Sequence, residues 1–134
     1  MTESRAMKNL DYLAAKHAQE LVQCPDMENT VTKALGVLQD NGVYACFLYL
    51  LAKESDKGLK TAQQMIGLLQ ESQLTASEET QEKAEDILHY VNAYISSARL
   101  KKLLLIKDLL ELMLIYSRYH AKTIEPIKNM EVSV

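Results

Sequence analysis

The stretch TKALGVLQDNGVYACFLYLLAK (32–53) constrains the fold most, because apolar residues recur at intervals of three and four on both sides of an Asn-Gly pair. Asn-Gly between apolar runs also marks β-hairpins, but a hairpin needs flanks that alternate with a period of two. The helical spacing favours a corner between two helices at Asp40–Val43. We expect Asn41 or Gly42 to take a left-handed conformation there and Asp40 or Asn41 to cap the second helix. The hairpin is the less favoured alternative.

Composition extends this helical interpretation to the whole chain. Four Gly, two Pro and no Trp among 134 residues make a turn-rich β architecture improbable. The abundant Leu, Ala, Lys, Glu and Gln are good helix formers, and the length suits one domain. We therefore predict an all-α fold, a single-domain bundle of about five to six helices over residues 1–134. The expected helices span 4–23, 26–39, 43–52, 59–71, a fifth segment ending near 98, and a long final helix over 98–123.

Several boundaries follow from local signals. Lys53–Gly58 is polar and predicts a loop, while Thr75 or Ser77 is positioned to cap the fifth helix, with Glu78–Glu82 in its first turn. The sequence ISSARLKK (95–102) allows a bend before the last helix. Pro126 is expected to end that helix, which makes residues 124–134 a loosely ordered tail.

Two of the expected helices carry apolar residues outside their main apolar stripe. Tyr44 and Leu48 add a second stripe to the helix after Asn-Gly, which predicts that other helices cover it on most sides. On the last helix, Leu104, Ile115 and Tyr119 fall among charged residues. They are either ordinary surface positions or contacts with another subunit.

The N-terminal segment, the length of the apolar stretches and the two cysteines suggest where the protein resides and whether its thiols are reduced. The N-terminal segment is charged and periodic, and no apolar stretch reaches the roughly 20 residues of a membrane span. Cys24 stands beside Pro25, and Cys46 lies within an apolar run, so we expect no disulfide. The expectation is a cytoplasmic protein without membrane contact.

No catalytic arrangement is apparent. His17, His89 and His120 are far apart, and Asp86-x-x-His89 lacks the second motif of a di-iron bundle. Two isolated cysteines supply no zinc site, and there is no Gly-rich phosphate loop. We expect no enzyme, no metal and no cofactor. His17, on the apolar stripe of the first helix, is expected to be a hydrogen-bonded structural histidine.

Charge is unevenly distributed along the chain. Residues 71–86 hold six acidic residues against one lysine, whereas residues 99–128 hold seven basic residues against three acidic ones. One interpretation is two solvated helix faces; the other is a polar molecule with one end suited to polyanions.

The segment KALGVLQDNGVYACFLYLLAKESDK (33–57) resembles the small α-helical subunit of type III-B CRISPR effector complexes, the fifth protein of the Cmr module. The leucine-rich DLLELMLIYSRYHAK (108–122) is similar to that family's basic-aromatic final helix. Gln39 and Asp40 stand where the family tends to carry a basic residue. The positions that carry the resemblance are Leu38, Asn41, Gly42, Val43, Ala45, Phe47, Leu48 and Lys53.

The resemblance implies a non-catalytic subunit whose copies stack in a filament beside backbone subunits that hold the guide RNA. It would face target RNA through phosphate contacts, without reading bases. Self-association, the backbone subunit, guide RNA and target RNA are the implied partners. The alternatives are the small subunit of another CRISPR surveillance complex and a helical interaction or regulatory module unrelated to nucleic acid. The candidate RNA-contacting residues are Lys53, Lys57, Lys101, Lys107, Arg118 and Lys122.

Overall fold

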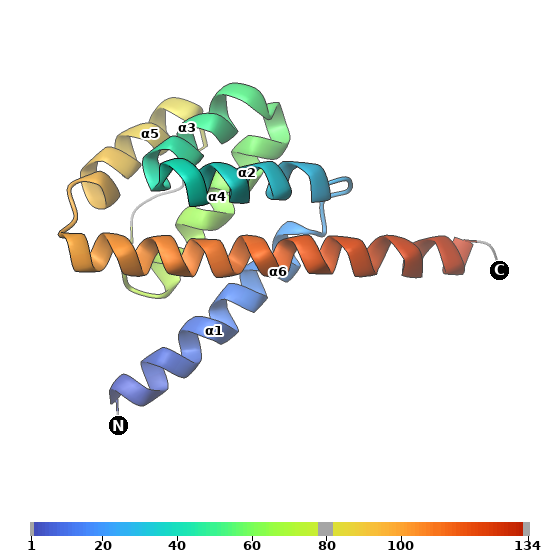
Figure 1. Ribbon diagram of the computed structural model, residues 1–134, viewed down its shortest axis with the longest axis horizontal. Helices are drawn as coiled ribbons and strands as arrows, with labels where there is room; N and C mark the ends of the chain where they lie inside the picture. Colours follow the sequence, from blue (N-terminus) through green and yellow to red (C-terminus); the bar gives the residue numbers. More distant parts are fainter. Residues whose placement is uncertain (1, 78–81, 133–134) are drawn as a thin grey trace.

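The computed structural model describes the backbone of residues 2–77 and 82–132, and the side chains of residues 10–77 and 82–123. Within these ranges it contains helices and no strands, which confirms the all-α bundle (Figure 1). The elements in chain order are α1 (Thr2–Leu21), α2 (Glu28–Asn41), α3 (Val43–Lys53), α4 (Ser55–Glu71), α5 (Ala84–Val91), the short π-helical segment η1 (Asn92–Ser96) and α6 (Leu100–Val132).

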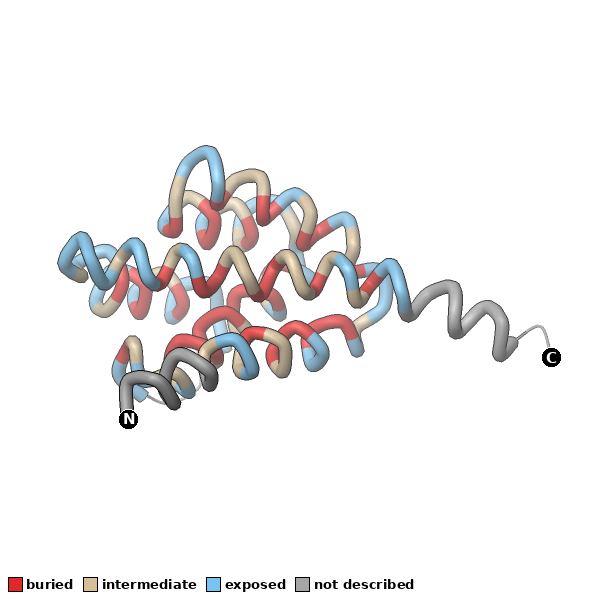
Figure 2. Tube along the Cα trace, turned by 60° about the horizontal axis from the view of Figure 1, so that its bottom comes forward, coloured by how far each residue is buried: buried red, intermediate tan, exposed pale blue. Residues whose placement is uncertain are grey.

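The long helix α6 organises the bundle. Figure 1 shows it running across the view, with α2 beside it on the side of α3–α5 and α1 crossing it on the other side. Helices α1 and α2 make most of its contacts, while α3 packs on α2 and α4 behind them. Figure 2 shows the buried residues on the facing sides of these helices. Ile106, Leu110, Met113 and Leu114 of α6 are fully buried there, so its inner face joins the common core.

The Asn-Gly pair is a helix–helix corner, as predicted. Gly42 has φ 98° and ψ −175°, and its N–H donates to the carbonyl of Leu38 at 3.1 Å. Its carbonyl accepts from the N–H of Cys46 at 3.1 Å, so one glycine closes α2 and opens α3. Asn41 still belongs to α2, and no side chain caps α3. The predicted capping by Asp40 or Asn41 is therefore wrong.

Helix α3 is covered on one face only. Val43, Cys46, Phe47 and Leu50 are buried against α2, α4 and α5. The second stripe is open to solvent, with Tyr44 42% and Leu48 43% exposed. The prediction that α3 is enclosed on most sides is wrong, because Tyr44 and Leu48 lie on a side that its neighbours leave uncovered.

Two predicted starting points also differ. Helix α4 begins at Ser55 and not at residue 59, so the expected loop shrinks to a sharp turn in which Ser55 has φ 52°. Helix α5 begins at Ala84. Thr75 does not cap it, because its hydroxyl hydrogen-bonds the hydroxyl of Tyr90 at 2.7 Å. Positions 78–81 of the proposed acidic first turn lie outside the described residues.

The last helix is longer than expected. The predicted bend appears between η1 and α6, but α6 continues past Pro126 to Val132. Proline has no N–H, so the carbonyl of Lys122 loses its helical partner while the helix itself goes on. The expected helix end at Pro126 is replaced by helical backbone, and positions 133–134 lie outside the described residues.

Candidate nucleic-acid interface

A hollow opens where the turn between α1 and α2 faces the middle of α6. Its volume is about 340 Å³, and Asp26, Glu28, Asn29, Thr32 and Arg118 line it. Four of these residues come from the turn and the first turns of α2, and Arg118 reaches across from α6. The turn is shaped by Asp26, whose φ is 59°.

Lys57 of α4 fixes that turn from behind. Its ammonium Nζ donates to the backbone carbonyl of Asp26 at 3.1 Å. The contact uses one of three ammonium donors and leaves the Asp26 carboxylate free. Lys57 itself remains exposed, so its charge contributes to the field around the hollow.

Arg118 is the least satisfied polar group in this region. Its Nε is buried without a hydrogen-bond partner. Across the described residues its guanidinium forms no ion pair either, although the carboxylates of Asp26 and Glu28 line the same hollow. Buried polar groups are normally paired, and the guanidinium fork matches the oxygens of phosphate and carboxylate. An oxyanion entering the hollow would meet the part of the guanidinium that lines it and supply acceptors there.

Lys122 stands one helical turn beyond Arg118 and faces the same way. Its Nζ lies 3.9 Å from Oε1 of Glu28, with the two side chains 45% and 39% exposed. An ion pair this long and this exposed contributes little, so Lys122 is free to turn toward another anion. Tyr119, three residues before Lys122, is 64% exposed beside it.

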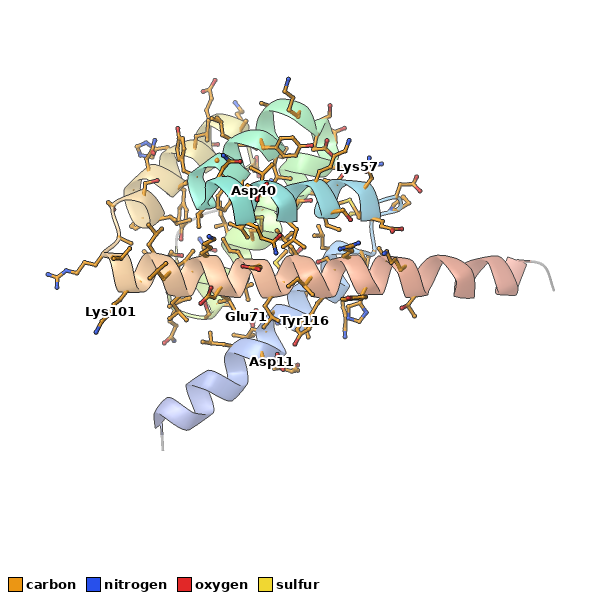
Figure 3. The ribbon with its side chains drawn as sticks, in the orientation of Figure 1. Asp11, Asp40, Lys57, Glu71, Lys101 and Tyr116 are labelled. Atoms are coloured by element: carbon orange, nitrogen blue, oxygen red, sulfur yellow. The ribbon has the colours of Figure 1, made fainter. Side chains whose placement is uncertain are left out.

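The structure brings together three of the six predicted cations. Arg118 lines the hollow, while Lys57 and Lys122 each contact one other residue of its lining, Asp26 and Glu28 respectively. Figure 3 shows Lys101 at the start of α6, at one end of the molecule and away from Lys57. Lys107 precedes Arg118 by about 16 Å along α6, at a rise of about 1.5 Å per residue. Lys53 is exposed in the last turn of α3 and is not among the residues that line the hollow.

The residues of the hollow that come from the turn before α2 and from its first turns were not predicted from the sequence. Asp26, Asn29 and Thr32 follow Pro25 at intervals of three, a spacing that puts polar side chains on one face at the start of a helix. That pattern was available, but only the tertiary position of α6 reveals that the face meets an arginine.

In a second polar cluster, between α1 and α4, the side chains hydrogen-bond one another. His17 is buried; its Nδ1 accepts from the amide of Gln64, and its Nε2 donates to Glu71 at 2.8 Å. Lys16 donates to the same carboxylate at 2.9 Å. The hydrogen bonds from Lys16 and His17 hold the pKa of Glu71 below its usual value. The prediction of a hydrogen-bonded structural histidine is confirmed.

The predicted subunit-contact residues differ in exposure. Leu104 is 52% exposed and Tyr119 64%, whereas Ile115 packs partly against the core. The first turns of α6 also expose two leucines that the sequence analysis did not select, Leu100 and Leu105. We call Leu100, Leu104 and Leu105 the leucine ridge.

Neither a metal-binding cluster nor a membrane-spanning helix is found in the part of the chain that the structure describes. No three His, Cys, Asp or Glu side chains there lie close enough to hold a metal ion. No helix in it combines the length and apolar character needed to cross a membrane. Comparison of the chain with family models, curated proteins and solved structures finds no match.

Proposed function

We propose that the protein is a non-catalytic, RNA-contacting small subunit of a CRISPR RNA-guided effector complex of the type III-B (Cmr) kind, in the cytoplasm. The observation that carries the RNA contact is the position of Arg118 in the hollow, half-buried and without a partner, with Lys57 and Lys122 close by. The identity of the complex rests on the resemblance around Asn41-Gly42 and in the last helix.

The charges at the hollow suit a small RNA contact within a larger assembly. Arg118 lines the hollow beside the carboxylates of Asp26 and Glu28. Outside the lining, Lys57 contacts the backbone carbonyl of Asp26 and Lys122 approaches Glu28, so positive and negative charge nearly balance around it. Such a surface holds one or two phosphates weakly by itself. Subunits that hold the guide RNA would supply the remaining affinity. The protein would help to position the RNA and would not catalyse its cleavage.

The leucine ridge supports a place inside an assembly. Leu100, Leu104 and Leu105 are 70%, 52% and 42% exposed, and Arg99 and Lys101 are exposed beside them. Apolar side chains that form a contiguous exposed patch are typical of a protein–protein contact. The hollow and the ridge lie toward different parts of α6, so RNA and a neighbouring subunit could be bound together.

The test is RNA binding by charge variants as a function of salt. We expect Arg118→Gln and Lys122→Gln each to weaken binding of single-stranded RNA and to reduce the slope of log affinity against log salt by about 0.7. Lys101→Gln, at the far end of α6, is the matched control and should leave both unchanged. Fluorescence anisotropy measures affinity, and circular dichroism confirms retained helix.

The assembly is tested separately by purification from the native host. Recovery of the tagged protein with guide RNA and repeat-associated RNA-binding subunits supports the proposal. A salt-independent affinity, or equal effects of Arg118→Gln and Lys101→Gln, would contradict the RNA contact. Recovery as a lone monomer without RNA would contradict the complex. Recovery with subunits of a different CRISPR complex would select that alternative.

The open face of α3 favours a second candidate function. Tyr44 and Leu48 are one turn apart and exposed, which suits a module that binds a partner's amphipathic helix. In that case Leu48→Glu should abolish capture of the partner protein, and RNA affinity should show no dependence on Arg118.

A further inference from the structure

The hollow at Arg118 is too large and too mixed in charge for a phosphate alone. Its volume of about 340 Å³ lies at the lower end of the range for small-ligand sites, about 300–1,000 Å³. Beside the one guanidinium it presents the carboxylates of Asp26 and Glu28, which repel a phosphate at close range. An occupant must therefore offer an anion to one wall and hydrogen-bond donors to the other.

The five lining side chains are available for such an occupant. Within the described residues no hydrogen bond joins any two of them, and the only ion contact they make is the 3.9 Å approach of Lys122 to Glu28. Arg118 supplies donors only, the two carboxylates supply acceptors only, and Asn29 and Thr32 supply both. All five lining residues are of polar types and none carries an aromatic ring, so recognition would depend on hydrogen bonds and not on stacking.

We infer that the hollow takes one unpaired nucleotide of the bound RNA, with its phosphate on Arg118 and the Watson–Crick edge of its base on Asp26 and Glu28. The inference rests on the proposed function and adds a base preference to it. A base paired in a duplex has its edge occupied, so the nucleotide must be single-stranded.

The chemistry of the edges ranks the four bases. Guanine presents two adjacent donors, N1–H and the N2 amino group, which fit one carboxylate in a bidentate way. Adenine and cytosine present one exocyclic amino group each, a donor that carboxylates accept from. Uracil presents a single N–H between two carbonyl oxygens, and those oxygens face the carboxylates unfavourably. The hollow should therefore prefer guanine and disfavour uracil.

The experiment compares a short oligouridine with the same oligonucleotide carrying one central guanosine. With the wild-type protein we expect the guanosine to tighten binding about tenfold, the equivalent of one good bidentate pair. Asp26→Asn is a suitable variant because asparagine tolerates a positive φ, and it is combined with Glu28→Gln. This double variant should lose the guanosine advantage while binding oligouridine as well as or better than the wild type, since two repelling charges are gone.

The outcomes separate this inference from the proposed function. Equal binding of both oligonucleotides by the wild type overturns the base preference, even where Arg118→Gln weakens both. A guanosine advantage that survives in the double variant also overturns it. Guanosine monophosphate is the probe for the free-nucleotide source. Saturable binding of guanosine monophosphate without any guanosine advantage in RNA would assign the hollow to a nucleotide ligand and overturn the RNA assignment.

Discussion

Gly42 holds the corner between α2 and α3 in a backbone conformation that is essentially restricted to glycine, at φ 98° and ψ −175°. A Cβ added there would meet nothing within 4 Å, so backbone strain is the whole effect of a substitution. We expect Gly42→Ala to lower the free energy of unfolding by about 1–3 kcal/mol. Urea denaturation monitored by circular dichroism measures it.

Gly36 provides the matched control within the same helix. It lies in the interior of α2, a Cβ there also meets nothing within 4 Å, and its φ is not positive. Gly36→Ala should therefore stabilise the protein by about 0.5–1 kcal/mol. A loss of stability at Gly36, or a neutral substitution at Gly42, would contradict this account of the corner.

The two thiols differ in environment and should differ in reactivity. Burial raises the pKa of Cys46 to about 12, and its Sγ donates to the carbonyl of Ala34 at 3.4 Å. The raised pKa favours the neutral thiol in the folded state. Its contribution to stability is therefore present below pH 9.0, the ordinary value, and is lost as pH rises toward 12. Below that window Cys46 should resist thiol reagents because the thiolate is the reactive form.

Cys24 is only partly buried, so it should be modified first. The measurement is the time course of labelling by mass spectrometry, with and without denaturant. Cys24→Ser should remove the fast phase and leave Cys46 reactive only after unfolding. Rapid labelling of Cys46 in the folded protein would show that α2 and α3 do not shield it.

Between elements, the contact of α1 with α4 depends on Glu71. This carboxylate occupies the last residue of α4, where the helix dipole disfavours negative charge. Lys16 and His17 from α1 offset that effect through hydrogen bonds of 2.9 and 2.8 Å. Because the Glu71 side chain is 38% exposed, solvent screening limits its contribution to less than about 1 kcal/mol.

The pH dependence of Glu71→Gln follows from the lowered pKa. The carboxylate contributes stability above its unfolded pKa, 4.5, and loses that contribution as pH falls through the still lower folded value. Glu71→Gln should therefore be less stable than the wild type at neutral pH, and the difference should vanish in acid. Asp108→Asn, at an exposed site on α6, is the control. A constant difference at every pH would mean that side-chain shape, and not charge, matters at Glu71.

Helix boundaries that depend on the local spacing of apolar residues were predicted from the sequence. Boundaries that depend on packing between helices were not. The corner at Gly42 followed from apolar spacing on its flanks. The start of α4 did not, because Lys53–Gly58 is polar and Gly58 is buried only by packing. A Cβ at Gly58 would lie 1.9 Å from the carbonyl oxygen of Leu50, so glycine there permits close approach of α3 and α4. In the sequence, a glycine required by close helix packing cannot be distinguished from a glycine in a loop.

The candidate site divides in the same way. Charge type and helix position were sufficient to select Arg118 and Lys122. The partners Asp26 and Glu28 required knowledge that the start of α2 faces α6. The exposure of Tyr44 and Leu48 could not be predicted either. An apolar stripe favours burial, but it does not show whether another helix of the same chain packs on it.

At the scale of the whole molecule, the leucine ridge is the surface that an isolated bundle explains least. Its three leucines are 70%, 52% and 42% exposed at the start of α6, and burying a leucine side chain fully is worth about 1.5–3 kcal/mol. Because Leu104 contributes little to the core, Leu104→Glu should change the free energy of unfolding by no more than about 0.5 kcal/mol. The same change should reduce retention of the protein in its complex, because a carboxylate would be buried at the contact.

Ala52→Glu, exposed on α3, is the control for added charge. The measurement is co-purification of the other subunits, together with sedimentation of the isolated protein over a range of concentrations. If Leu104→Glu is retained as well as Ala52→Glu and sediments as the wild type does, the ridge is free surface and the subunit contact lies elsewhere.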